Sequence, residues 1–96
     1  MRTIKYTSRF KRDYRREKSG IHGRKLDALL KAILVLLAED KALPPNAVDH
    51  ALIGTLNDCR DCRDCHIRPD LILIYRKIDY TILELVRLGS HSELGL

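Results

Sequence analysis

Three histidines and one aspartate in the second half of the chain have side chains suited to proton transfer. They are His50, His66, His91 and Asp70, which follows His66 by four residues. Imidazole both accepts and donates a proton near neutral pH, and several imidazoles with a carboxylate suit general acid–base catalysis. Pro69 favours a turn, so a chain reversal there would bring His66 and Asp70 together at the mouth of a hairpin. Sequence periodicity alone does not unite the three histidines, and scattered histidines are more often surface or core residues than a site.

A cysteine-rich repeat precedes His66. The segment Asp58–Cys65 reads DCRDCRDC, so Cys59, Cys62 and Cys65 fall at i, i+3 and i+6. Three thiolates and the following imidazole are zinc ligands, and a small zinc-binding nucleic-acid module built on them is one alternative function. Structural zinc sites usually pair two short knuckles across a longer loop, and on a strand the middle cysteine would face away from the other two. The favoured interpretation is therefore three reduced thiols and no metal.

Positive charge is concentrated at the N-terminus. The chain has a formal net charge of +5, yet residues 1–25 hold ten basic and two acidic residues, whereas residues 26–96 hold eight basic and eleven acidic ones. A patch of this kind attracts polyanions, of which nucleic acid is the commonest. A solvated helix face and an acidic protein partner are the two alternatives.

The pattern of elements that must position these residues predicts a single domain over residues 1–96. Alternation and helical periodicity predict a strand at 2–7, helices at 9–18 and 24–39, a loop to about 56, a strand ending near His66, and strands at 71–75 and 81–88. Ser8 is the expected cap of the first helix. Helices grouped before strands indicate an α+β fold, a small antiparallel β-sheet with two N-terminal helices packed on one face.

Hydrophobic runs are too short for a membrane span. The longest covers seven residues, Ala32–Ala38, whereas a transmembrane helix needs about 20. The N-terminus has no apolar stretch of the signal-peptide kind. We therefore expect a cytoplasmic protein that does not enter a membrane.

Four motifs occur in the order typical of one family of small bacterial proteins. They are Asp-His-Ala-Leu with a following glycine (49–54), Arg-Asp-Cys-His-Ile-Arg-Pro-Asp (63–70), Leu-Ile-Leu-Ile-Tyr (71–75) and Leu-Gly-Ser-His-Ser-Glu-Leu (88–94). Residues 6–13 also look like the opening of these proteins, where a short strand leads into a basic helix. Over nearly its whole length the chain resembles the RelE/ParE superfamily of type II toxins, and within it the YafQ-like branch of mRNA interferases.

The resemblance implies a RelE-like β-α-α-β-β-β fold and an activity. Toxins of this branch are ribosome-dependent endoribonucleases that enter the A site of the 70S ribosome and cut mRNA there. The chemistry needs no cofactor. The resemblance also implies a cognate antitoxin, a dimeric DNA-binding protein. The toxin would contact operator DNA only through this antitoxin.

The family's catalytic positions fall on His50, His66, Asp70 and His91 in this sequence. The resemblance favours His91 as general acid and His50 or His66 as general base. Asp70 would orient an imidazole or share the role of base. These roles could be exchanged among the histidines.

Arginines and lysines are the candidates for contact with RNA. Arg63 and Arg87 are expected to stabilise charge on the phosphate in the transition state, and a surface ion pair is the alternative for each. Arg87 precedes His91 by four residues, so the two would share a face if the last strand continues that far. The expected phosphate contacts to RNA or the ribosome are Lys11, Arg12, Arg15 and Arg16.

Three features depart from the family's pattern. The Asp-Cys-Arg repeat adds about three residues before His66, and an odd insertion inside a strand reverses the facing of every residue on one side of it. Leu56 stands where the family has an aromatic residue, and no aromatic follows His91 to stack on an mRNA base. A catalytically weak or inactive relative, which acts by binding its antitoxin or another target, is therefore the main alternative function.

Overall fold

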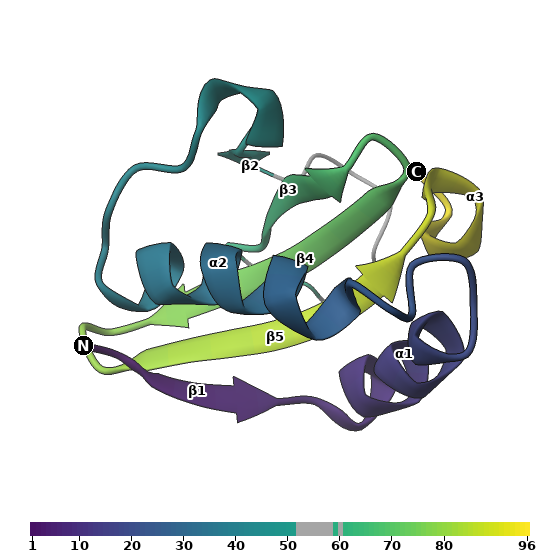
Figure 1. Cartoon of the computed structure of the whole chain (residues 1–96). Helices are drawn as coiled ribbons and strands as arrows, with labels where there is room; N and C mark the ends of the chain where they lie inside the picture. The colour runs from purple at the N-terminus through teal and green to yellow at the C-terminus, as the bar shows by residue number, and fades with distance from the viewer. Residues whose placement is uncertain (52–58, 60) are drawn as a thin grey trace.

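A five-stranded sheet with helices against one face and one end makes up the computed structural model, which describes residues 1–51, 59 and 61–96 (Figure 1). The strands are β1 (Thr3–Tyr6), β2 (His50–Ala51), β3 (Arg63–Arg68), β4 (Leu71–Ile78) and β5 (Ile82–Gly89). The helices are α1 (Ser8–Lys18), α2 (Leu26–Ala38) and α3 (His91–Leu94), with a 3-10 turn, η1 (Pro45–Ala47), before β2. The predicted α+β fold is confirmed.

The strand order is β1-β5-β4-β3-β2. Neighbours pair antiparallel except at one edge, where β1 runs parallel to β5. The sheet is therefore mixed. Because two helices and three other strands separate β1 from β5 in the chain, no tight turn imposes an antiparallel pairing on them.

The sheet is buried on both faces at β4, as its continuous apolar sequence predicts. On the face covered by α2, the strand residues Leu73 and Tyr75 join a core with Phe10 of α1 and Leu30 of α2. On the opposite face a smaller cluster contains Cys62, Ile72, Ile74 and Leu94. Leu94 comes from α3, so burial of this side chain fixes the C-terminal helix against the sheet.

Two helix starts differ from the prediction. Thr7, not Ser8, caps α1, and its Oγ1 accepts a hydrogen bond from the Phe10 amide at 3.0 Å. The last strand ends at Gly89, and α3 begins at His91 behind a capping box formed by Ser90 and Glu93. His91 therefore does not continue β5, so the expectation that strand alternation places it beside Arg87 is wrong.

The cysteines also differ from the prediction of three reduced thiols. Cys59 and Cys62 form a disulfide bond, and only Cys65 is free. Cys65 lies in the α2-side core, where burial raises its pKa to about 12. β3 starts at Arg63, so Cys59, Asp61 and Cys62 of the repeat lie before the strand. Leu56 lies outside the described residues.

No helix in the part of the chain that the structure describes is both long enough and apolar enough to cross a membrane.

Candidate active site

Asp70 and His91 form a hydrogen-bonded pair at the open end of the β3–β4 turn. Asp70 Oδ1 lies 3.0 Å from the ring Nδ1 of His91 and accepts the backbone N–H of the same residue at 3.2 Å. The hydrogen bond from the His91 side chain, followed by the one from its backbone, lowers the pKa of Asp70. Both side chains are largely exposed. A carboxylate that binds Nδ1 fixes the ring orientation and directs Nε2 away from the pair.

His66 adds a second imidazole to this pair. Its ring meets the His91 ring edge-to-face, with 5.4 Å between the ring centroids. The register of β3 against β4 shifts between His66 and Arg68, which marks a bulge next to the histidine. The structure thus brings together three of the four predicted residues, although Asp70 bonds to His91 and not to His66 as the hairpin argument predicted.

His50, the fourth predicted residue, lies on the edge strand β2, where it pairs with Asp64 of β3. Its Nδ1 is 2.9 Å from Asp64 Oδ1 and 3.1 Å from the Ala51 carbonyl oxygen. Asp64 is 5% exposed, and within the described residues its Oδ1 has no partner with hydrogen-bonding angles. Asp64 and His66 are two residues apart on β3 and so share one face. The sequence reasoning missed Asp64, although this alternation with His66 was there to indicate it.

Asp49, next to His50, is held by two side chains. The hydroxyl of buried Tyr75 donates to Asp49 Oδ1 at 2.5 Å, and Arg63 Nε donates to the same oxygen at 3.2 Å. Burial, and then the bond to Asp49, raise the pKa of Tyr75. Val48 has a φ of 47°, a left-handed conformation that costs a β-branched residue roughly 1–3 kcal/mol. The bonds to Asp49 offset this strain and fix where His50 enters β2.

Arg87 points to α1 and contacts a residue that the sequence reasoning missed. Asp13 is 3% exposed, and Arg87 donates to its carboxylate twice, from Nε at 2.6 Å and from Nη2 at 3.2 Å. Arg16 Nη1 and the Leu88 amide donate to Asp13 as well, both at 3.1 Å. Sequence periodicity could not indicate this contact because Asp13 and Arg87 lie 74 residues apart.

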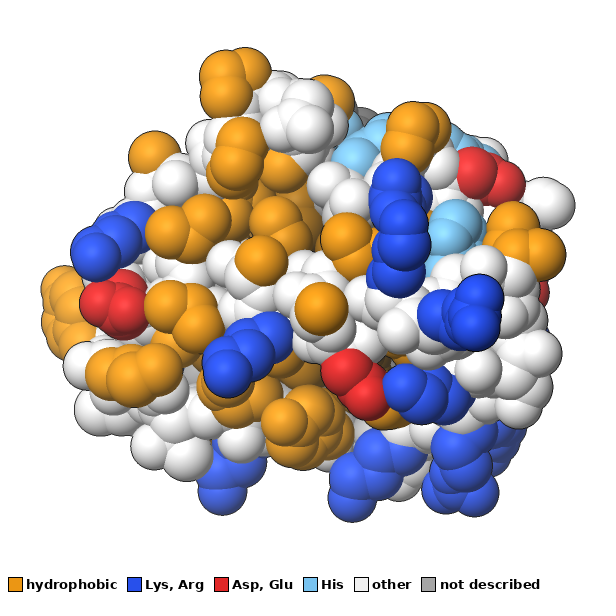
Figure 2. All heavy atoms as spheres, viewed as in Figure 1, with side chains coloured by type: hydrophobic (Ala, Val, Ile, Leu, Met, Phe, Trp, Pro, Cys, Tyr) orange, Lys and Arg blue, Asp and Glu red, His pale blue; other side chains and the backbone are white. Residues whose placement is uncertain are grey.

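The predicted basic residues of α1 are all exposed. They are Lys11, Arg12, Arg15 and Arg16. Figure 2 shows Lys and Arg side chains gathered at the lower right, over the position of α1 in Figure 1. The positive patch that the sequence predicts therefore lies on the surface near α1.

The described residues include no group of three or more His, Cys, Asp or Glu placed to hold a metal ion. Cys59 and Cys62 are bonded to each other, so the thiolates that the zinc alternative requires are not available.

A family match and similar solved structures assign this mixed-sheet α+β fold to the toxins of type II toxin–antitoxin systems. The family described as bacterial toxin of type II toxin–antitoxin system, YafQ, matches residues 2–95, and the chain belongs to this family.

Solved structures agree with this assignment. A metal-bound toxin from Helicobacter pylori is 38% identical with a TM-score of 0.78, covering 98% of this chain and 99% of that one. A copper-bound mutant toxin from the same organism is 32% identical with a TM-score of 0.79 and the same coverage. YafQ in the Escherichia coli DinJ–YafQ complex is 30% identical with a TM-score of 0.76, covering 98% of each chain. No curated protein sequence matches this chain.

Proposed function

We propose that this toxin is an endoribonuclease that cleaves mRNA in the ribosomal A site by metal-independent general acid–base catalysis. The observation that carries the proposal is the cluster of His66, His91 and Asp70, in which two imidazoles lie in contact and one of them is hydrogen-bonded to a carboxylate. Two imidazoles of this kind supply an acid and a base at one place near neutral pH.

The proposed reaction is an internal transesterification. The ribose 2′-oxygen attacks the adjacent phosphorus, the bond from phosphorus to the 5′-oxygen breaks, and the products are a 2′,3′-cyclic phosphate and a 5′-hydroxyl. The base removes the 2′-hydroxyl proton, and the acid protonates the leaving 5′-oxygen. His91 is assigned as acid because Asp70 on its Nδ1 fixes the ring and directs Nε2 outward.

The base is assigned to His66, because its contact with His91 allows both rings to reach one phosphodiester group. His50 is the alternative base, and Asp64 would orient it. Arg63 and Arg87 are proposed to stabilise negative charge on the phosphate. Each is already held by a carboxylate, Asp49 or Asp13, so its position is set before substrate arrives.

The proposed partners follow from the same assignment. The DinJ–YafQ complex of Escherichia coli supports a cognate antitoxin for this chain, and contact with operator DNA is proposed through that antitoxin alone. The 70S ribosome and its mRNA are the proposed targets, and the cytoplasm is the proposed location of the toxin. Basic residues of α1 are proposed to serve two roles, some neutralising phosphates of RNA and the others receiving an acidic antitoxin segment. They are Lys11, Arg12, Arg15 and Arg16.

Cleavage of mRNA on programmed 70S ribosomes tests the proposal. Wild-type toxin should cut within the A-site codon and leave 5′-hydroxyl ends, and His91→Ala should reduce the rate by about 100-fold or more, the usual contribution of a general acid. Ser92→Ala is the matched control, because Ser92 is exposed in the same helix. Absence of cleavage by folded wild type that still binds its antitoxin would contradict the proposal and favour a binding role.

A further inference from the structure

One side of α1 and β5 enclose a polar cleft of 290 Å³. We call it the arginine cleft, and its lining is Arg9, Arg12, Asp13, Arg16 and Arg87. The three arginines of α1 are three and four residues apart, so they lie along one side of the helix. Four guanidinium groups around one cavity, against a single lining carboxylate, are suited to an anionic ligand.

Asp13 holds two of the arginines of this cleft in place. Its buried carboxylate accepts two hydrogen bonds from Arg87 and one from Arg16. An arginine bound through its planar fork to a buried carboxylate has little freedom left to lose when a ligand arrives. Arg87 and Arg16 are therefore fixed in the cleft before a ligand arrives.

The four guanidiniums are not equally available to a ligand. Arg16 is largely occupied by contacts within the protein, because it also binds Glu17, Glu93 and the Leu88 carbonyl oxygen. Within the residues that the structure describes, Arg9 and Arg12 make no side-chain hydrogen bond or ion pair, and they are exposed at the rim. The ligand-binding groups of the arginine cleft are thus Arg9, Arg12 and the remaining N–H groups of Arg87.

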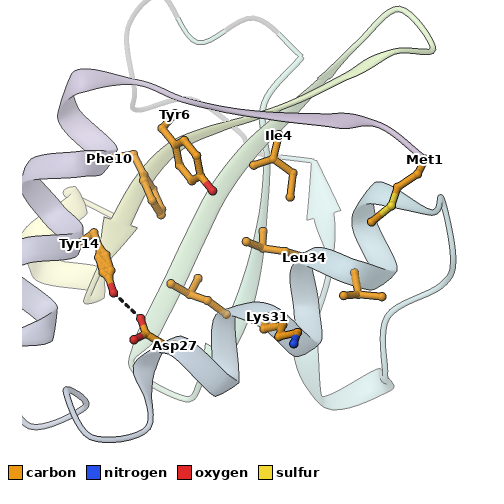
Figure 3. Close-up of a pocket in the computed structure, with 10 residues that line it drawn as sticks. Met1, Ile4, Tyr6, Phe10, Tyr14, Asp27, Lys31 and Leu34 are labelled. Carbon is orange, nitrogen blue, oxygen red and sulfur yellow. Dashed lines mark hydrogen bonds between the residues drawn. The ribbon is translucent and has the colours of Figure 1, made fainter.

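The opposite side of α1 has a different character. Lys11 and Arg15 border a groove of 400 Å³ together with Tyr6, Phe10 and Tyr14. Figure 3 shows these three rings in the space between β1, α1 and α2, where Tyr14 is hydrogen-bonded to a residue of α2. Aromatic side chains line this groove, so the two charges on its border lie beside an apolar surface and not in a polar cleft.

We propose that the arginine cleft binds phosphodiester groups of RNA through Arg9, Arg12 and Arg87, and that Lys11 and Arg15 on the opposite side of α1 do not take part. This proposal narrows the proposed function by dividing the basic residues of one helix between two surfaces. It gives Arg87, which Asp13 holds, a bound phosphate in the cleft in place of the reacting phosphate of the proposed function.

Two double variants of the full-length chain test the division. Arg9→Gln with Arg12→Gln and Lys11→Gln with Arg15→Gln each remove two exposed positive charges from α1. Affinity is measured over a series of KCl concentrations for two probes, a short unstructured RNA oligonucleotide and vacant 30S subunits, with circular dichroism to verify folding. For the oligonucleotide, the cleft variant should lower the slope of log affinity against log salt by about 1.4, since each lost contact to a single strand contributes roughly 0.7. The opposite-side variant should keep the wild-type slope.

Each outcome bears on the proposal separately from nuclease activity. If the slope of the cleft variant falls only with 30S subunits, the site is supported and its ligand is ribosomal RNA. If the slope falls only with the oligonucleotide, the site is supported and its ligand is mRNA. Equal losses in both variants, no loss in the cleft variant, or no salt-dependent binding by wild type would overturn it. Vacant subunits hold no mRNA to cut, so the cleft can be confirmed when programmed-ribosome cleavage fails, or refuted when cleavage succeeds.

Discussion

Two carboxylate–cation pairs in this toxin have the same chemistry and opposite surroundings. Asp13 and Arg87 are 4% and 19% exposed in their side chains, whereas Asp70 and His91 are 70% and 47% exposed. The first pair joins α1 to β5, and the second lies open at the end of the sheet. Burial makes removal of one partner costly because the other charge is left without solvent. Exposure costs the fold little and leaves the second pair accessible to a substrate.

Asp13→Asn should cause the largest change in stability. The substitution leaves Arg87 partly buried without its counter-charge, and we expect the free energy of unfolding to fall by about 3–5 kcal/mol. Urea unfolding followed by circular dichroism measures this loss. Glu39→Gln is the control, because Glu39 pairs only with Lys41 among the described residues, and both side chains are exposed; its loss should leave the midpoint nearly unchanged. Equal effects of the two substitutions would remove the distinction between buried and exposed pairs.

His66→Gln should show the reverse behaviour. As the proposed base, His66 should contribute about 100-fold or more to the cleavage rate on programmed ribosomes. It contacts His91 at the open end of the sheet, so we expect the free energy of unfolding to change by less than about 0.5 kcal/mol. If His66→Gln cleaves normally and His50→Gln does not, the role of base belongs to His50.

The sequence predicted those parts of the molecule that follow a pattern among neighbouring residues. Regular apolar spacing predicted α2, which spans Leu26–Ala38, and a continuous apolar run predicted that β4 is buried on both faces. Family motifs indicated His66, Asp70 and His91, and the structure places these three residues together. Such features are written within a few neighbouring residues, which is why a single sequence is enough to find them.

Contacts between distant segments could not be predicted in this way. In the sequence, Asp13 is a polar residue of a basic helix, and only the packing of β5 against α1 gives it Arg87 as a partner. The parallel pairing of β1 with β5 likewise depends on the path of the whole chain. The start of α3 is a different case. Ser90 and Glu93 have the spacing of a capping box, so the local signal for a helix beginning at His91 was present in the sequence.

Tyr75→Phe tests a third polar contact, intermediate in burial between the two pairs. It removes the hydroxyl that donates to Asp49, and a hydrogen bond to a charged group contributes roughly 1.5–3 kcal/mol. We therefore expect a loss of about 2 kcal/mol in urea unfolding at neutral pH. The raised pKa of Tyr75 means that the fold favours the neutral phenol, so its contribution is present below the ordinary pKa near 10 and is lost as pH rises through the raised value. A Tyr75→Phe variant that is as sensitive to alkali as wild type would contradict this role.

Asp70→Asn should produce the smallest change in stability, and that change should be confined to a pH window. The pKa of Asp70 is lowered because His91 donates hydrogen bonds to its carboxylate. A carboxyl whose pKa falls on folding contributes stability above its ordinary value, near 3.9, and loses it as pH falls through the lowered value. The difference in melting temperature between wild type and Asp70→Asn should therefore be measurable in calorimetry at mildly acidic pH and vanish in strong acid. A difference that stays constant across this range would mean that the carboxylate's charge contributes nothing, and the exposed pair would then be held by position alone.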